Sequence, residues 1–78
     1  MDPRPDPKVL IDLVRTRMPF GKYQGRLICD IPLAYVVWMR QKDAIPKGKL
    51  GELLLNLYEI KSNELGFLFK ELKLQYGD

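Results

Sequence analysis

A single cysteine and the absence of histidine most constrain how this 78-residue chain can fold. A domain of this size buries only about 60–65% of the surface of its unfolded chain, so small domains commonly add disulfides, a metal or a partner subunit. Cys29 has no second cysteine with which to form an internal disulfide, and without histidine it cannot build a Cys/His zinc site. We therefore expect a fold that rests on apolar packing, alone or with self-association, with no metal or cofactor.

The composition is that of one globular domain. Hydrophobic residues make up 46% and charged residues 29% of the chain, which is ordinary for a folded protein. No apolar run approaches the roughly 18 residues that span a bilayer, and the polar, proline-rich start does not resemble a secretory signal. We predict a flexible arm at residues 1–6, a single domain over residues 7–78, and a cytoplasmic location without membrane contact.

Apolar periodicity predicts three to four helices. The segments run from Pro7 to about Thr16, from Leu33 to about Lys42, from near Lys49 onward, and from about Glu64 to Lys73. Asp6 is placed as the N-cap of the first, with Pro7 at its first helical position. The second is apolar on nearly all sides, which predicts a buried central helix with Trp38 as its largest core residue.

A glycine-bracketed turn lies between the first two helices. Gly21 and Gly25 enclose a Lys-Tyr-Gln tip, with apolar residues on both sides. Met18–Phe20 and Arg26–Cys29 are therefore predicted to pair as short strands. The fold class that follows is α+β, a single small domain with a short two-stranded β-hairpin packed against three to four α-helices.

The positive charge gathers in two loop-centred clusters. The net charge is only +3, but residues 15–26 carry four cations and no acid. Residues 40–49 carry four cations against Asp43, whereas the chain from Leu50 onward holds three lysines and five acids. This distribution suggests two anion-facing regions, although charge on a solvated loop is a sufficient explanation.

These clusters supply the candidate binding residues. They are Lys22, Tyr23, Gln24 and Arg26 in the hairpin, and Lys47 and Lys49 beside Gly48. Lys22 and Arg26 can reach phosphates while Tyr23 stacks on an unpaired base. Lys47 and Lys49 precede a helix N-terminus, where free N–H groups favour an anion. Alternatively, Tyr23 packs on Trp38 or Met39, and Pro46 and Gly48 merely shape a turn.

Catalysis is not expected. Without histidine, neither a Ser-His nor a Cys-His pair can form, and Asp30 beside Cys29 tends to raise the pKa of the thiol, the opposite of what a nucleophile needs. Glu52 and Glu59 share a helix face that Asp30 could approach. A small metal-dependent hydrolase is thus a third alternative, which requires acidic side chains that converge in a pocket.

Three motifs in a fixed order carry a family resemblance. They are MPFGKYQGRLI from Met18, DIP from Asp30 with an aromatic-rich helix up to Trp38, and PKGKLGEL from Pro46. Over about residues 10–65 they resemble small bacterial proteins labelled "putative quorum-sensing-regulated virulence factor". The Phe-Gly-Lys-Tyr-x-Gly, Ile-Pro and Tyr-x-x-Trp elements are also similar to a short module attached to some bacterial exonucleases of the proofreading type. That likeness implies an accessory role in contact with nucleic acid, and it carries over no catalytic residue.

We predict a non-enzymatic accessory module that binds single-stranded DNA or RNA, or strand ends, through the hairpin and the Pro-Lys-Gly-Lys loop. This requires both basic regions to face the same way, with the ring of Tyr23 open to water. The alternative is a protein–protein adaptor or a homodimer. Four apolar side chains beyond the needs of one small core favour it: Leu55, Tyr58, Phe67 and Tyr76.

Overall fold

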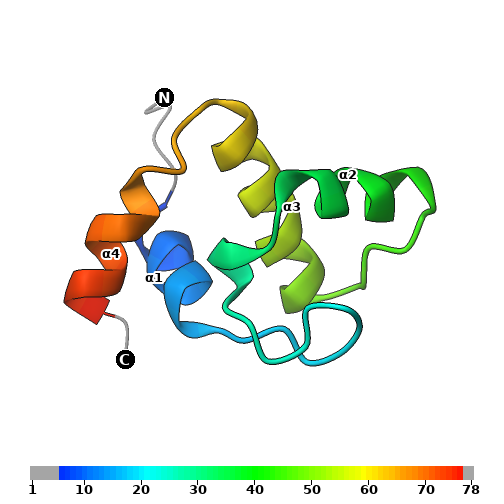
Figure 1. Ribbon diagram of the computed structural model, residues 1–78, viewed down its shortest axis with the longest axis horizontal. Helices are drawn as coiled ribbons and strands as arrows, with labels where there is room; N and C mark the ends of the chain where they lie inside the picture. Colours follow the sequence, from blue (N-terminus) through cyan, green and yellow to red (C-terminus); the bar gives the residue numbers. More distant parts are fainter. Residues whose placement is uncertain (1–5, 77–78) are drawn as a thin grey trace.

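The computed structural model describes residues 6–76. Its elements are α1 (Pro7–Arg15), the 3₁₀ helix η1 (Ile28–Asp30), α2 (Leu33–Gln41), α3 (Lys49–Ser62) and α4 (Leu68–Tyr76). α3 contacts α1, η1 and α2, while α4 packs on α1. In Figure 1, α3 therefore lies between α1 and α4 on one side and α2 on the other. The predicted arm of residues 1–6 lies outside the described residues, except for Asp6.

The central helix is α3. Its apolar residues recur every three or four positions, so one face is buried against its neighbours. The buried side chains on that face are Leu53, Leu54, Leu57 and Ile60. Around them pack apolar residues from the other elements, among them Leu13, Val14, Met18, Ile28, Ile31, Val36, Met39 and Phe69. Full burial of each large side chain contributes about 1.5–3 kcal/mol.

The start of α1 confirms the sequence prediction. The Asp6 carboxylate accepts a hydrogen bond of 2.9 Å from the Lys8 backbone N–H, and Pro7 occupies the first helical position. α1 ends at Arg15, and Thr16 is its C-cap.

α4 begins four residues later than predicted, at Leu68 rather than Glu64. Glu64 has φ = 60°, which interrupts the helical path after α3. The Leu65 backbone N–H donates to the Ile60 carbonyl at 2.9 Å, so it closes the end of α3 instead of starting a new helix.

The prediction of an α+β fold with a two-stranded hairpin is wrong. Residues 6–76 contain four α-helices and no strand, and the chain between α1 and η1 is joined by one isolated antiparallel bridge between Arg17 and Leu27. The chain does reverse where predicted. The molecule is therefore a small all-helical domain in which a tight loop, residues 16–27, replaces the β-hairpin.

Local geometry stops the ladder after one bridge. Gly25 and Arg26 both face Met18: the Gly25 N–H donates to the Met18 carbonyl at 2.8 Å, and the Met18 N–H donates to the Arg26 carbonyl at 2.7 Å. Two residues opposite one form a bulge, which Gly25 permits with φ = 85°. Pro19 has no N–H to extend the pairing, and the chain enters η1 at Ile28. Neither side has room for a strand.

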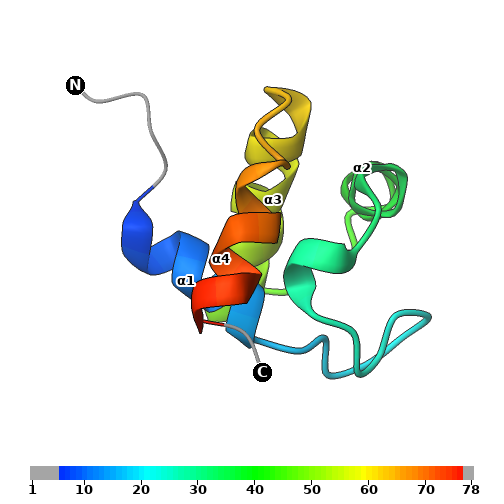
Figure 2. The same ribbon diagram turned by 60° about the vertical axis from the view of Figure 1, so that its left-hand side comes forward.

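The prediction that the second helix is central and buried, with Trp38 in the core, is also wrong. Only Val36 and Met39 of α2 are buried, and Trp38 is 48% exposed. α2 packs on α3 along one side and lies at the outer edge of the molecule (Figure 2). A nine-residue helix at an edge buries one stripe, whatever the polarity of its other faces.

Candidate nucleic-acid interface

Three aromatic side chains form a continuous row between the loop and α2. The Tyr23 ring meets the Tyr35 ring edge to face, with centroids 4.8 Å apart and an interplanar angle of 76°. Tyr35 in turn stacks with Trp38, with ring centroids 5.6 Å apart and an interplanar angle of 28°. We call Tyr23, Tyr35 and Trp38 the aromatic platform. Its outer end is Trp38, which is also its most exposed ring.

A lysine borders this platform. The Lys22 Nζ lies 5.7 Å from the centroid of the Tyr23 ring, within reach of a cation–π attraction. Lys22, Tyr35 and Trp38 line an open hollow of about 400 Å³. The hollow therefore combines aromatic walls with one exposed cation, which are the two components that a stacked nucleotide requires.

Backbone turns hold the loop end of the platform. The Gln24 N–H donates to the Gly21 carbonyl at 3.1 Å, and the Arg26 N–H donates to the Tyr23 carbonyl at 3.0 Å. A side chain adds to these backbone bonds: the Arg17 Nη1 donates to the Gly25 carbonyl at 2.7 Å. These bonds fix the position of Tyr23, which is half-buried: its ring meets that of Tyr35, and it packs against the core cluster of which Met39 is a member.

Helical spacing determines the position of the α2 end of the aromatic platform. Tyr35 and Trp38 are three residues apart, so their side chains lie on the same face of α2. Val36 and Met39 have the same spacing one position further on, and they face the core. The sequence therefore divides this short helix into a buried stripe and an aromatic stripe, although all four residues are apolar or aromatic.

The remaining predicted residues are less closely grouped. Gln24, Arg26 and Lys47 are exposed. Lys49 forms a 3.0 Å ion pair with Asp12 of α1, and that hydrogen bond, followed by the attraction of the same carboxylate, raises the pKa of Lys49. The loop of residues 16–27 and the start of α3 occupy the same, lower end of the molecule in both views (Figures 1 and 2). The charge of Lys49 is nevertheless paired with Asp12 of α1 and does not face the loop as a free cation.

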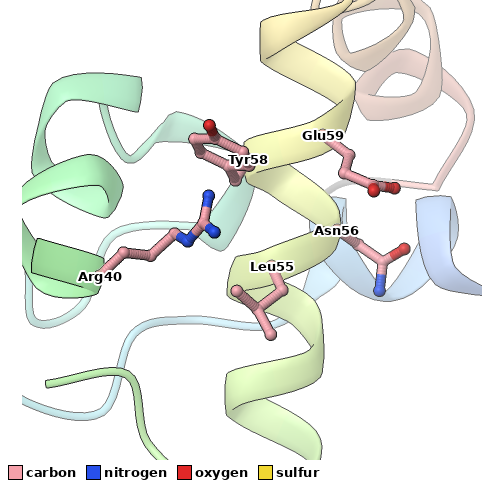
Figure 3. A pocket seen from close by; sticks show the side chains of 5 residues that line it. All are labelled: Arg40, Leu55, Asn56, Tyr58 and Glu59. Carbon is pink, nitrogen blue, oxygen red and sulfur yellow. The ribbon is translucent and has the colours of Figure 1, made fainter. Parts of the chain in front are cut away.

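A second hollow, of about 330 Å³, lies along α3 and reaches Arg40 of α2. It is lined by Arg40, Leu55, Asn56, Tyr58 and Glu59. The Arg40 guanidinium lies over the Tyr58 ring, 4.3 Å from its centroid. Figure 3 shows Arg40 reaching from α2 toward Tyr58, while Asn56 and Glu59 point away on the other side of α3. Arg40 thus links α2 to α3 and does not belong to the aromatic platform.

The cysteine lies in a separate, buried cluster. Burial, and then the neighbouring Asp30 carboxylate, raises the pKa of the Cys29 thiol, which disfavours the thiolate. Lys73 of α4 forms an ion pair with Asp30, and the Lys61 Nζ donates to the Ile31 carbonyl at 2.7 Å. Burial lowers the pKa of Lys61. These contacts tie η1 to α3 and α4.

No group of three Cys, Asp or Glu side chains in residues 6–76 lies close enough together to hold a metal ion. The metal-dependent hydrolase alternative required such a group. Nor does any helix in this part of the chain have the length and apolarity needed to cross a bilayer.

Sequence reasoning missed Tyr35 and Trp38 as site residues. Because α2 is apolar on most sides, its pattern does not indicate which side faces the core. One signal was present: a domain of this size cannot bury every apolar residue of a short peripheral helix. The largest ring is the hardest to accommodate in such a core.

Comparison with known proteins places the chain in a family. A family model described as "putative quorum-sensing-regulated virulence factor" matches residues 6–72. The chain belongs to this family. It is 47% identical over 64 residues to Uncharacterized protein YpeB of Escherichia coli strain K12, and equally so to YpeB of strain O157:H7, covering 82% of this chain and 89% of each relative. No solved structure matches the chain. The likeness to an exonuclease module and the cytoplasmic location stay predictions.

Proposed function

We propose that this protein binds single-stranded nucleic acid without catalysing a reaction, with an unpaired base stacked on Trp38. The observation that supports the proposal is the exposure of Trp38, at 48%, beside Tyr35 and Lys22 around one open hollow. Stacking on an aromatic side chain contributes about 1–3 kcal/mol per base and tolerates any base. Lys22 would neutralise a neighbouring phosphate, and the exposed Arg26 would extend the contact along the strand.

This arrangement favours a single strand over a duplex. Bases in a duplex are already stacked and paired, so they cannot present a free face to Trp38. A strand that crosses the hollow would place one base on the platform while its backbone passes Lys22. The proposal covers both DNA and RNA, because the base face and the phosphate are common to both.

A titration with 20-mer oligo(dT) and oligo(U) tests the proposal. Trp38 is the only tryptophan, so we expect its fluorescence to be quenched as a base stacks on it. The dissociation constant at low salt should be micromolar to about 100 µM and should rise with salt, as phosphate contacts require. A duplex of the same length is the control. The proposal would be contradicted if the fluorescence stays unchanged and no salt-sensitive binding is found with a dissociation constant below about 1 mM.

A matched pair of lysine variants tests the geometry. Lys22→Ala and Lys49→Ala each lower the formal net charge from +3 by one. The slope of log K against log salt is negative, and we expect Lys22→Ala to reduce its magnitude by about 0.7, the value for one phosphate contact on a single strand. Lys49→Ala should leave the slope unchanged, because Lys49 is paired with Asp12. Equal slopes for both variants, measured by fluorescence anisotropy, would mean that only overall charge matters.

The alternative, a protein–protein interaction module, is favoured by a different observation. The exposed Leu55 beside the Arg40–Tyr58 hollow and the exposed Phe67 and Leu74 at α4 lie outside the aromatic platform. An oligonucleotide titration in which binding is absent, together with self-association, would favour this second function.

A further inference from the structure

The outward side of α4 carries the most exposed large apolar side chains of the described chain. Leu74 is 81% exposed and Phe67 is 69% exposed. Lys70 and Glu71 lie between them and are also exposed. Exposed apolar residues of this size mark an interaction surface when they share one face of an element.

Helical geometry places these four residues on one face. Counting from Phe67, they occupy positions i, i+3, i+4 and i+7, which lie on one side of a helix. Phe67 precedes α4, but its carbonyl already accepts a 3.3 Å hydrogen bond from the Lys70 N–H, so it belongs to the first helical turn. We call Phe67, Lys70, Glu71 and Leu74 the α4 strip.

The opposite side of α4 is occupied by the protein itself. Phe69 is buried in the core, and Lys73 forms its ion pair with Asp30 of η1. Neither charge of the strip takes part in an ion pair in residues 6–76, where the two pairs are Lys49–Asp12 and Lys73–Asp30. The strip is thus an outer face whose charged groups have no partner in the described part of the chain.

The order of residues along the strip is self-complementary. In an antiparallel pair of α4 helices with a two-fold axis between positions 70 and 71, Lys70 faces Glu71 of the partner subunit, and Phe67 faces Leu74 of the partner subunit. The same two contacts recur on the other side of the axis, as a two-fold interface requires. A strip with charges of one sign would repel its own copy, whereas this one pairs opposite charges twice.

We propose that the α4 strip is a homodimer interface, occupied by the same strip of a second copy of this chain. α4 and α2 lie on opposite sides of the molecule (Figure 1), so the dimer leaves both aromatic platforms accessible. The strip contributes four residues from each copy, whereas a standard interface involves about 20–30 residues a side, so the dimer is weak and depends on concentration. Two platforms on one dimer would strengthen binding to a long strand through avidity.

Sedimentation equilibrium of the full chain up to about 1 mM tests the interface. We expect wild type to dimerise in the upper part of this range. Lys70→Glu and Glu71→Lys each place like charges opposite one another at both contacts, and should lower the association constant about tenfold. An equimolar mixture of the two variants restores opposite charges at both contacts, so it should associate as strongly as wild type.

Leu74→Asp should abolish association altogether, and Leu55→Asp on α3 is the matched control. Circular dichroism checks that each variant keeps its helices, and the exposure of these side chains makes that outcome expected. Three results would overturn the proposal: a monomer throughout, a dimer that Leu74→Asp leaves intact, or a mixture of charge variants that associates no better than either alone. Oligonucleotide binding is measured separately, since a monomer can bind through its platform.

Discussion

Trp38→Ala should lower oligonucleotide affinity about tenfold to a hundredfold while the protein stays folded. The loss corresponds to the roughly 1–3 kcal/mol that one stacked base contributes. A core tryptophan would behave differently, because its truncation costs about 3–5 kcal/mol of stability. Trp38 is 48% exposed and contacts Tyr35, while Val36 and Met39 hold α2 on the core. We therefore expect the free energy of unfolding to fall by no more than about 1 kcal/mol.

Fluorescence anisotropy of a labelled oligo(dT) measures the affinity, and urea unfolding followed by circular dichroism measures the stability. Trp38→Phe should retain most of the affinity, because a phenyl ring still offers a stacking face. Leu55→Ala removes a similarly exposed apolar side chain from α3 and serves as the control. Unchanged affinity for Trp38→Ala would show that Trp38 is not a binding surface, and a fall in stability of several kcal/mol would show that its ring is part of the core packing.

The helices were predictable because their signals are local. The Asp6 cap and Pro7 define the start of α1, and the leucine spacing of α3 defines its buried face without reference to the rest of the fold. The strands were not predictable in the same way. Two short apolar segments around a glycine turn have the pattern of a hairpin, but the bulge at Gly25 and the start of η1 decide whether a ladder can extend. η1 contacts α1 and α3, so where it begins depends on parts of the chain outside the turn.

The residues of the candidate site divide in the same way, into those positioned by local sequence and those positioned by packing. Lys22 and Tyr23 lie in the turn where the sequence placed them, since the turn itself determines which residues reach its tip. Trp38 was misplaced because an apolar helix carries no sequence signal for its orientation, which is set by packing on α3. Lys49 was expected to be available to an anion, whereas it pairs with Asp12, 37 positions earlier in the chain. Pairing across such a separation is a property of the fold.

Gly51→Ala should destabilise the protein, although Gly51 lies in the first turn of α3 and alanine is the better helix former. Helix propensity alone predicts a gain of at most about 1 kcal/mol for this change. A Cβ at position 51, however, would lie 1.8 Å from the Pro46 carbonyl oxygen and 3.0 Å from its carbon. These are backbone atoms of the segment that leads into α3, so either the helix or the segment must move. Overpacking of this kind costs about 1–3 kcal/mol or more, which outweighs the gain in propensity.

Thermal unfolding measures the effect, and we expect the melting temperature to fall by about 4–8 °C for each kcal/mol lost. Gly66→Ala is the matched control, because the nearest atom to its added Cβ is the Lys61 Cγ at 3.9 Å, an ordinary contact. That variant should be neutral within about 0.5 kcal/mol. Ile45 packs against the core and lies 3.4 Å from the added Cβ of Gly51→Ala, so displacement of this segment also disturbs the core beside α3. If Gly51→Ala melts at the same temperature as Gly66→Ala, the close approach of Pro46 to α3 does not constrain the fold.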